Sequence, residues 1–296
     1  MPTFYSDGLR FNYATRGVGS YTFFFQHGIG GNLSQPFRFL GSSNDKNLNA
    51  VKEGGSEALP FRLAAFDFRA HGATPLGDPK KLCIDRFAGD LMAFMDHLDV
   101  EAAVLGGISM GAAVALRAAL RYPQRCLGLV LSRPAWLHGS MSSAAVAAYT
   151  EAARLLQEES SAQSALQKLE ISDIYRQLSA VSPDAGKSLL GQIRCVVSDP
   201  WLLEAAVARL QCLPTGQIGL DLKSAAAVSV PTLIMATPSD PIHPLCYAEA
   251  LAAAIPRASL VKLAPKELND QLHIDEVNSR IREFLDSVTI WTRRNR

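Results

Sequence analysis

Gly107-Ile108-Ser109-Met110-Gly111 is the stretch that decides the fold of this 296-residue chain. The apolar run just before it, residues 102–105, indicates a short buried strand, and apolar side chains then recur at helical spacing until Pro123. A strand that turns directly into a helix needs room at the bend, and the two glycines supply it because they have no Cβ. The stretch therefore predicts a strand, a sharp turn at Ser109 and a helix.

The predicted turn makes Ser109 a candidate nucleophile. It would hold the hydroxyl outward at a helix N-terminus, where free backbone N–H groups and the helix dipole favour negative charge. The tetrahedral oxyanion of an acyl-transfer reaction is such a charge, and a glycine-flanked serine between strand and helix is the pattern of a nucleophile elbow. The alternative interpretation is an ordinary glycine-flanked turn.

The composition is that of a globular protein: 48% of the residues are hydrophobic and 19% are charged, enough to bury a large core. The charges of the 29 basic and 28 acidic residues nearly cancel. No broad electrostatic field therefore favours binding to nucleic acid or to an anionic membrane. The one basic cluster, Arg293, Arg294 and Arg296, is interpreted as a frayed tail.

Cysteine usage and the N-terminal residues indicate a soluble protein of the cytoplasm. The five cysteines are scattered singly, which argues against a disulfide framework and against a zinc site. Asp7 and Arg10 precede any apolar run, and the apolar stretch at residues 22–25 is too short to span a membrane. We therefore expect neither a signal peptide nor a membrane anchor.

Apolar patterns along the chain predict an α/β fold. In the first third, strands are expected at 9–14, 21–26 and 61–66, paired by hairpins, with a short helical piece at 36–40 and a long surface loop at 41–59. From residue 84 onward helix and strand patterns alternate, with an amphipathic helix through Phe87 to Leu98 and an apolar strand at 127–131. Alternation of this kind is typical of a parallel sheet.

A helical segment interrupts this alternation. Residues 140–222 contain helical patterns at 144–156, 164–178 and 201–210 without a strand. The α/β pattern then resumes with strands at 232–236 and 260–263 and helices at 245–255 and 277–288. The predicted fold is a mostly parallel central sheet with helices on both faces. Its core comprises residues 1–136 and 226–296, and an inserted helical cap comprises residues 137–225.

A nucleophilic serine needs a base, and the base needs a carboxylate that orients it. Asp240 directly follows the predicted strand 232–236, and functional residues of parallel sheets gather at such strand ends. The strand at 127–131 leads into a segment without a carboxylate, so Asp240 is the predicted acid. The alternative is an Asx turn in a proline-rich loop.

Two histidines are candidates for the base. His273 lies between the last predicted strand and the last helix, which gives the chain order Ser109, Asp240, His273, and we predict it as the base. It lies well past Pro265, so a structural role at the start of the helix remains open. His243 is the alternative base, although its closeness to Asp240 in sequence argues against an orienting contact between the two.

Glycines after the second predicted strand indicate an oxyanion-binding loop. In His27-Gly28-Ile29-Gly30-Gly31 they allow backbone N–H groups to turn toward a ligand, with a plain turn as the alternative. The amides of Ile29 and Met110 are the predicted donors, and Gly28 belongs to the same site.

Three further sets of residues lie near the predicted site. Trp136, at the start of the helical segment, is predicted to line the substrate pocket, with ordinary core packing as the alternative. Arg133 is interpreted as a structural residue rather than a ligand for a substrate carboxylate. Asp67, Arg69 and His71 are interpreted as a structural loop network, because the elbow already has another acid and base.

Taken together, these motifs resemble the α/β-hydrolase superfamily over nearly the whole chain. The elbow and the helical insertion are similar to the branch of small esterases, enol-lactonases and cofactor-free carbon–carbon hydrolases. The resemblance implies Ser109 as nucleophile, Asp240 as acid, His273 as base, oxyanion donors at Ile29 and Met110, and no metal or organic cofactor. Two departures from the family pattern are Ala70, where glycine is commoner, and the missing Gly-His pair after the last strand.

The sequence thus predicts a serine hydrolase that acts through an acyl-enzyme on a small, mostly apolar ester or lactone, with neither nucleic acid nor membrane as partner. Its oligomeric state is left open, a homodimer included. The alternatives are a ligand sensor with little turnover on the same fold and a carbon–carbon hydrolase.

Overall fold

The computed structural model describes residues 1–19, 21–40, 59, 61–219 and 221–294, the last five as backbone only. Its centre is an eight-stranded sheet in the order β1-β2-β4-β3-β5-β6-β7-β8. The strands are β1 (Thr3–Ser6), β2 (Leu9–Arg16), β3 (Thr22–Gln26), β4 (Arg62–Phe66), β5 (Ala103–Ile108), β6 (Cys126–Ser132), β7 (Thr232–Ala236) and β8 (Ala258–Lys262). The ladders of β1 with β2 and of β2 with β4 are antiparallel, and every other ladder is parallel. The fold class predicted from the sequence is confirmed.

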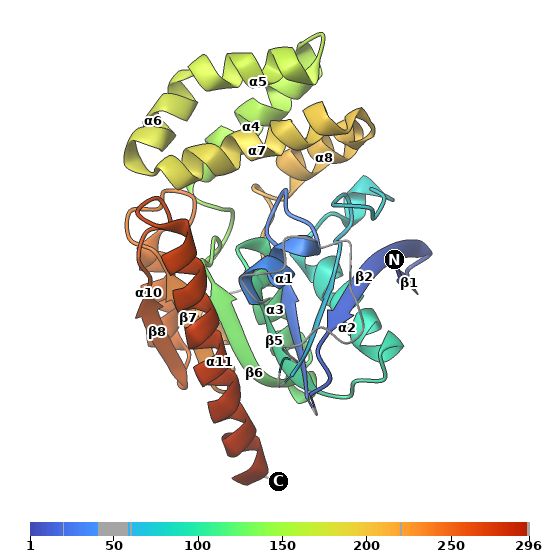
Figure 1. Ribbon diagram of the computed structural model, residues 1–296, viewed down its shortest axis with the longest axis vertical. Coiled ribbons are helices and arrows are strands. Elements are labelled where there is room, and N and C mark those ends of the chain that lie inside the picture. The colour runs from blue at the N-terminus through green and yellow to red at the C-terminus, as the bar shows by residue number, and fades with distance from the viewer. Residues whose placement is uncertain (20, 41–58, 60, 220, 295–296) are drawn as a thin grey trace.

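Helices cover both faces of the sheet (Figure 1), which is why β3 and β5 are buried along their whole length. One face is covered by α1 (Ser34–Leu40) and α11 (Asp270–Arg294), and the other by α2 (Ile84–His97), α3 (Met110–Arg121) and α10 (Leu245–Ala254). The core on the second face includes stacked and edge-on phenylalanines such as Phe4, Phe66 and Phe94.

Five helices form a separate group that we call the helical layer. They are α4 (Ser143–Glu158), α5 (Ala162–Ile171), α6 (Asp173–Val181), α7 (Pro183–Ser198) and α8 (Leu203–Cys212), and the short α9 (Leu222–Ala225) leads back to the sheet. The first four begin after serines whose hydroxyls accept a backbone N–H, namely Ser142, Ser161, Ser172 and Ser182. In Figure 1 this layer lies above the sheet, with α7 facing the ends of the parallel strands.

The elements depart from the sequence expectations in two places. The three strands expected in the first third are not paired by hairpins, because β3 lies parallel between β4 and β5, and β2 forms its hairpin with β1, a strand that was not predicted. The helix expected at 164–178 is divided at Ser172 into α5 and α6, and α7 was not predicted. Most of the loop expected at 41–59 lies outside the described residues. Within the described part of the chain, no helix has the length and apolar character needed to cross a membrane.

Candidate active site

The elbow at Ser109 has the predicted strand–turn–helix geometry. Ser109 joins β5 to α3 with φ 55° and ψ −107°, a conformation that costs energy for a residue with a side chain. A Cβ at position 107 would lie 2.4 Å from the carbonyl carbon of Gly111, and one at position 111 would lie 2.4 Å from the carbonyl oxygen of Gln26. Both glycines are therefore required by the close approach of backbone segments.

Ser109 lies at the end of a hydrogen-bonded chain of three side chains. Its Oγ is 2.9 Å from Nε2 of His243, and Nδ1 of the same ring is 2.8 Å from Oδ2 of Asp240. The three residues are 5–7% exposed, so the chain is shielded from bulk water. With the proton on Nδ1, the ring donates to Asp240 and its Nε2 accepts from the serine hydroxyl, which is the arrangement that general-base catalysis requires.

The tight turn after β7 explains why residues only three apart can pair. Oδ1 of Asp240 accepts the backbone N–H groups of Ile242 and His243 at 3.0 and 3.1 Å. This closes one turn in which side chains at i and i+3 lie on the same side, as in a 3₁₀ turn. The closeness in sequence that argued against His243 is therefore what brings its ring to Oδ2 of Asp240.

The prediction that His273 is the base is wrong, because the hydrogen bond to Ser109 comes from His243. His273 lies in the first turn of α11, where its Nδ1 donates to the carbonyl oxygen of Ala264 at 2.9 Å and its ring stands edge-on to Phe39. Burial lowers the pKa of His273, which favours the neutral ring. This histidine ties the connection after β8 to α11, the structural role that the sequence left open.

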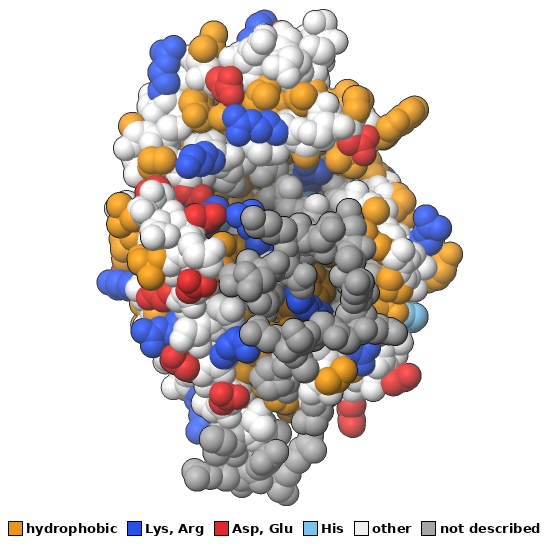
Figure 2. All heavy atoms as spheres, in the orientation of Figure 1, with side chains coloured by type: hydrophobic (Ala, Val, Ile, Leu, Met, Phe, Trp, Pro, Cys, Tyr) orange, Lys and Arg blue, Asp and Glu red, His pale blue; other side chains and the backbone are white. Residues whose placement is uncertain are grey.

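Charged groups surround Asp240. Nη2 of Arg133 lies 2.6 Å from Oδ2 of Asp240 and 2.9 Å from Oδ2 of Asp184 on α7, and Lys266 lies 3.2 Å from the other oxygen of Asp184. Burial alone would raise the pKa of Asp240, but its interactions with His243 and Arg133 hold it well below its usual range. Arg133 thus pairs with two carboxylates of the protein, in keeping with its predicted structural role. Figure 2 shows acidic and basic side chains close together along this seam between core and helical layer.

The loop after β3 is packed against the elbow. A Cβ on Gly28 would lie 3.3 Å from the Cβ of Ser109, and the Gly28 N–H donates to Oε1 of Gln35 at 2.8 Å. Met110 is the first residue of α3, so its N–H has no intrahelical acceptor. Among the described residues, no backbone hydrogen bond outside the helices and strands uses the amide of Ile29 or of Met110. Both remain available as donors.

His27 holds this loop to the loop after β4. Its Nδ1 donates to the carbonyl oxygen of Gly28 at 2.9 Å, and its Nε2 accepts the N–H of Phe68 at 3.1 Å. Both contacts are satisfied by the neutral ring. Burial lowers the pKa of His27 to about 4.

We expect this histidine to make folding pH-dependent. Between about pH 6.5 and about pH 4 the unfolded chain binds a proton at His27 that the folded chain does not, so the free energy of unfolding falls as the pH falls. From about pH 7.5 to about pH 5 this one group accounts for roughly 2 kcal/mol. Urea unfolding at both pH values should show a smaller difference in His27→Gln than in the wild type. The exposed His138 is the control, since His138→Gln should leave the difference unchanged.

Asp67, Arg69 and His71 form the structural network that the sequence predicted. Arg69 pairs with the fully buried Asp90 through two hydrogen bonds of 2.7 and 2.9 Å. Asp67 accepts the backbone N–H groups of Leu33 and Ala73, and Nδ1 of His71 donates to the carbonyl oxygen of Arg69. These contacts fix the loop after β4.

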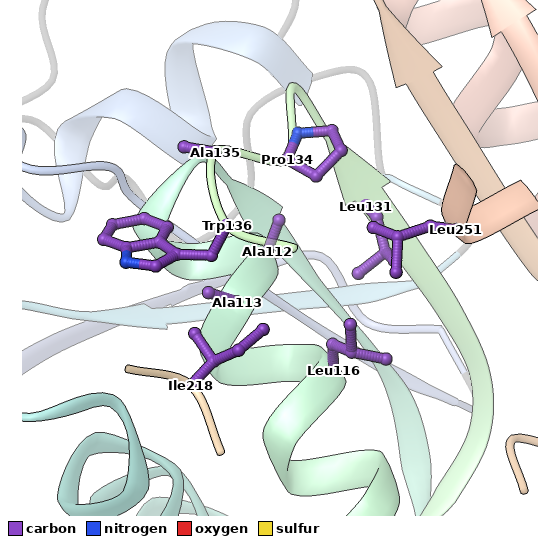
Figure 3. Close-up of a pocket in the computed structure, with 9 residues that line it drawn as sticks. All are labelled: Ala112, Ala113, Leu116, Leu131, Pro134, Ala135, Trp136, Ile218 and Leu251. Carbon is purple, nitrogen blue, oxygen red and sulfur yellow. The ribbon is translucent and has the colours of Figure 1, made fainter. Parts of the chain in front are cut away.

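Trp136 lines a small apolar cavity beside α3 (Figure 3). The lining residues are Ala112, Ala113, Leu116, Leu131, Pro134, Ala135, Trp136, Ile218 and Leu251. The indole N–H donates to the carbonyl oxygen of Gly216 at 3.2 Å, and the side chain is almost fully buried. The cavity begins one helical turn after Ser109 but includes none of Ser109, His243 and Asp240.

Sequence reasoning missed three residues of the site region, Asp184, Gln192 and Arg209, all from the helical layer. Gln192 on α7 donates to the carbonyl oxygen of Ile29 at 3.2 Å, so the helix touches the predicted oxyanion loop directly. The one available signal was spacing, because positions 184 and 192 lie two helical turns apart and therefore on one face. Among the described residues, no group of three or more His, Cys, Asp or Glu side chains is arranged to hold a metal ion.

Comparison with known proteins supports the fold. Residues 21–157 match the family model described as the alpha/beta hydrolase fold. The chain is 32% identical over 147 residues to the dihydrolipoyllysine-residue acetyltransferase component of the acetoin cleaving system of Cupriavidus necator, a match that covers 49% of this chain and 34% of that protein. It is 28% identical over 144 residues to 3-oxoadipate enol-lactonase 2 of Acinetobacter baylyi, which covers 46% of this chain and 48% of that one. The matches thus span half or less of each relative.

Solved structures extend the likeness to almost the whole chain. The enol-lactonase from Burkholderia xenovorans LB400 superposes with a TM-score of 0.68 at 20% identity, covering 96% of this chain and all of the other. An identity of 20% supports a shared fold and gives no evidence on function. The family match over residues 21–157, the sheet order and this neighbour together show that the chain has the α/β-hydrolase fold.

Proposed function

We propose that the protein is a serine hydrolase that cleaves a small carboxylic ester or lactone through an acyl-enzyme. The observation that carries the proposal is the 2.9 Å contact between Oγ of Ser109 and Nε2 of His243, with the ring oriented by Asp240. Ser109 is then the nucleophile, His243 the general base and Asp240 the acid that holds the ring and stabilises its charge.

The reaction follows from the positions of these atoms. Oγ of Ser109 attacks the carbonyl carbon of the substrate while its proton passes to Nε2 of His243. The N–H groups of Ile29 and Met110 stabilise the oxyanion, and His243 then gives the proton to the departing alkoxide, so that the acyl-enzyme remains. A water molecule attacks the acyl carbon with His243 again as base, which releases the acid and restores the serine.

The surroundings of Ser109 support a small substrate. The three side chains are nearly buried under the helical layer, and Ser142 at the start of α4 donates to the carbonyl oxygen of Pro241 beside them. Residues 137–225 therefore act as a cap in this proposal, and Gly28 borders the bound substrate. The enol-lactonases among the relatives are consistent with an ester or lactone as substrate. The five free cysteines fit the reducing cytoplasm.

A fluorophosphonate probe tests the proposal. We expect the wild type to be labelled at Ser109 and to hydrolyse a short 4-nitrophenyl ester, and we expect Ser109→Ala to lose both properties because the proposed nucleophile is gone. Ser179→Ala is the matched control, since Ser179 lies on α6 in the helical layer, and it should keep both. Peptide mapping identifies the labelled residue. A wild-type protein that binds ligands but takes up no label would instead support the sensor.

A further inference from the structure

Arg209 on α8 is a buried cation without a carboxylate partner among the described residues. It is 2% exposed; its Nη1 donates to the carbonyl oxygen of Ala70 at 2.9 Å, its Nη2 lies 3.1 Å from Sγ of Cys195, and its Nε has no partner. Arg69 is just as buried, yet it is paired with Asp90 at 2.7 Å. Arg69 therefore has a carboxylate as countercharge, whereas Arg209 has none among the described residues.

An unbalanced buried charge is costly. Removing an ion from water costs several kcal/mol unless a countercharge and hydrogen bonds replace the lost solvation. A carbonyl oxygen and a sulfur offer only weak compensation for a guanidinium, which stays protonated at any physiological pH. A methionine or leucine at this position would avoid the cost. Retaining an arginine here is consistent with an anion that joins it during function.

Contacts between neighbouring residues connect Arg209 to the proposed oxyanion loop. Cys195, which Arg209 contacts, is three residues after Gln192 on the same face of α7, and Gln192 holds the carbonyl oxygen of Ile29. Ala70, its other contact, is followed by His71, whose ring lies 5.0 Å from that of His27. Both series of contacts that start at Arg209 therefore reach the loop after β3, which packs against Ser109.

Unsatisfied polar atoms gather in this region. Oε1 of Gln192, Nε2 of His71 and Nε of Arg209 are all buried without a hydrogen-bond partner. Buried polar atoms in proteins are nearly always paired, and of these three the Nε–H of Arg209 is a donor whose missing partner an anionic acceptor would supply. A carboxylate would accept from Nε of Arg209 and would supply the countercharge that this guanidinium lacks among the described residues.

We propose that Arg209 binds a carboxylate carried by the acyl part of the substrate, so that the natural substrate is an anionic ester or lactone. The inference rests on the proposed function for its hydrolytic readout. The carbonyl is held at Ile29 and Ser109, while the carboxylate reaches under α7 to Arg209. The helical layer thus selects for charge as well as for size.

A matched pair of esters tests this charge selection. The mono-4-nitrophenyl ester of glutarate carries a free carboxylate, and 4-nitrophenyl methyl glutarate has nearly the same shape without the charge. We expect the wild type to favour the anionic ester in kcat/KM by at least about tenfold. Arg209→Met should abolish that preference, Arg209→Lys should keep part of it, and Cys195→Ala should keep it all, since it removes a contact of Arg209 but no charge.

A binding measurement separates this inference from the proposed chemistry. Calorimetric titration of Ser109→Ala with glutarate, and with glutaramide as the neutral control, needs no turnover. If glutarate alone binds and Arg209→Met removes that binding, the carboxylate site stands even when neither ester is hydrolysed. If the esters are hydrolysed through Ser109 with the same ratio in wild type, Arg209→Met and Arg209→Lys, and glutarate does not bind, Arg209 is only a structural link to Ala70 and the inference is overturned.

Discussion

Replacing His243 with alanine is expected to lower kcat/KM for a short 4-nitrophenyl ester by at least about a thousandfold, because Ser109 then has no base to take its proton. His273→Ala is expected to lower it by less than about tenfold, since His273 bonds to Ala264 and acts only through the packing of α11. Steady-state rates for the two variants side by side measure the contrast.

Both histidine variants need a check on folding, because both side chains are nearly buried. Circular dichroism and thermal unfolding show whether a loss of rate comes from a loss of structure. Asp240→Asn provides a further comparison, and it should resemble His243→Ala because an amide no longer holds the ring in the required tautomer. A folded His273→Ala that is inactive beside an active His243→Ala would return the role of base to His273.

Replacing Gly111 with alanine is expected to destabilise the protein by about 3 kcal/mol or more. The new Cβ would lie 2.4 Å from the carbonyl oxygen of Gln26 and 2.9 Å from that of His27, and both are backbone atoms that move only with β3 and its loop. The same movement would displace Ile29 from Ser109, so kcat/KM should fall by about a hundredfold. Urea unfolding and ester hydrolysis measure the two effects.

Gly191→Ala is the control for this substitution. Gly191 lies within α7, and a Cβ there meets nothing within 4 Å. Alanine favours a helix over glycine by up to about 1 kcal/mol, so this variant should be slightly more stable than the wild type and equally active. Equal stability of Gly111→Ala and Gly191→Ala would contradict the view that the elbow depends on close backbone approach.

The fold could be predicted from the sequence because its signals are local. Fully apolar runs mark strands such as β6 and β7, and the glycines around Ser109 mark the elbow. The place of β3 between β4 and β5 has no local signal, since it depends on pairing between distant segments. The helix α7 was missed because Gly186 and Gly191, poor helix formers, interrupt a pattern that tertiary packing then stabilises.

The site was predictable to the extent that each residue follows a strand. Ser109 and Asp240 were identified on that basis, and the structure joins them through His243. The choice between two histidines depended on the shape of one short loop, and periodicity carries no information on that shape. The partners of Arg133 and Arg209 lie partly on other elements of the fold, so neither contact could be read from the chain.

The turn from Asp240 to His243 has a consequence for how this protein can vary. The proposed acid and the proposed base, Asp240 and His243, lie within four consecutive residues. In the proposed mechanism the connection from β8 to α11 therefore contributes no group that transfers a proton. Insertions or deletions in that connection would change how α11 docks without parting the reacting groups. Mutation or recombination can therefore change the connection from β8 to α11 without loss of the catalytic groups. The turn from residue 240 to residue 243 has to be kept intact.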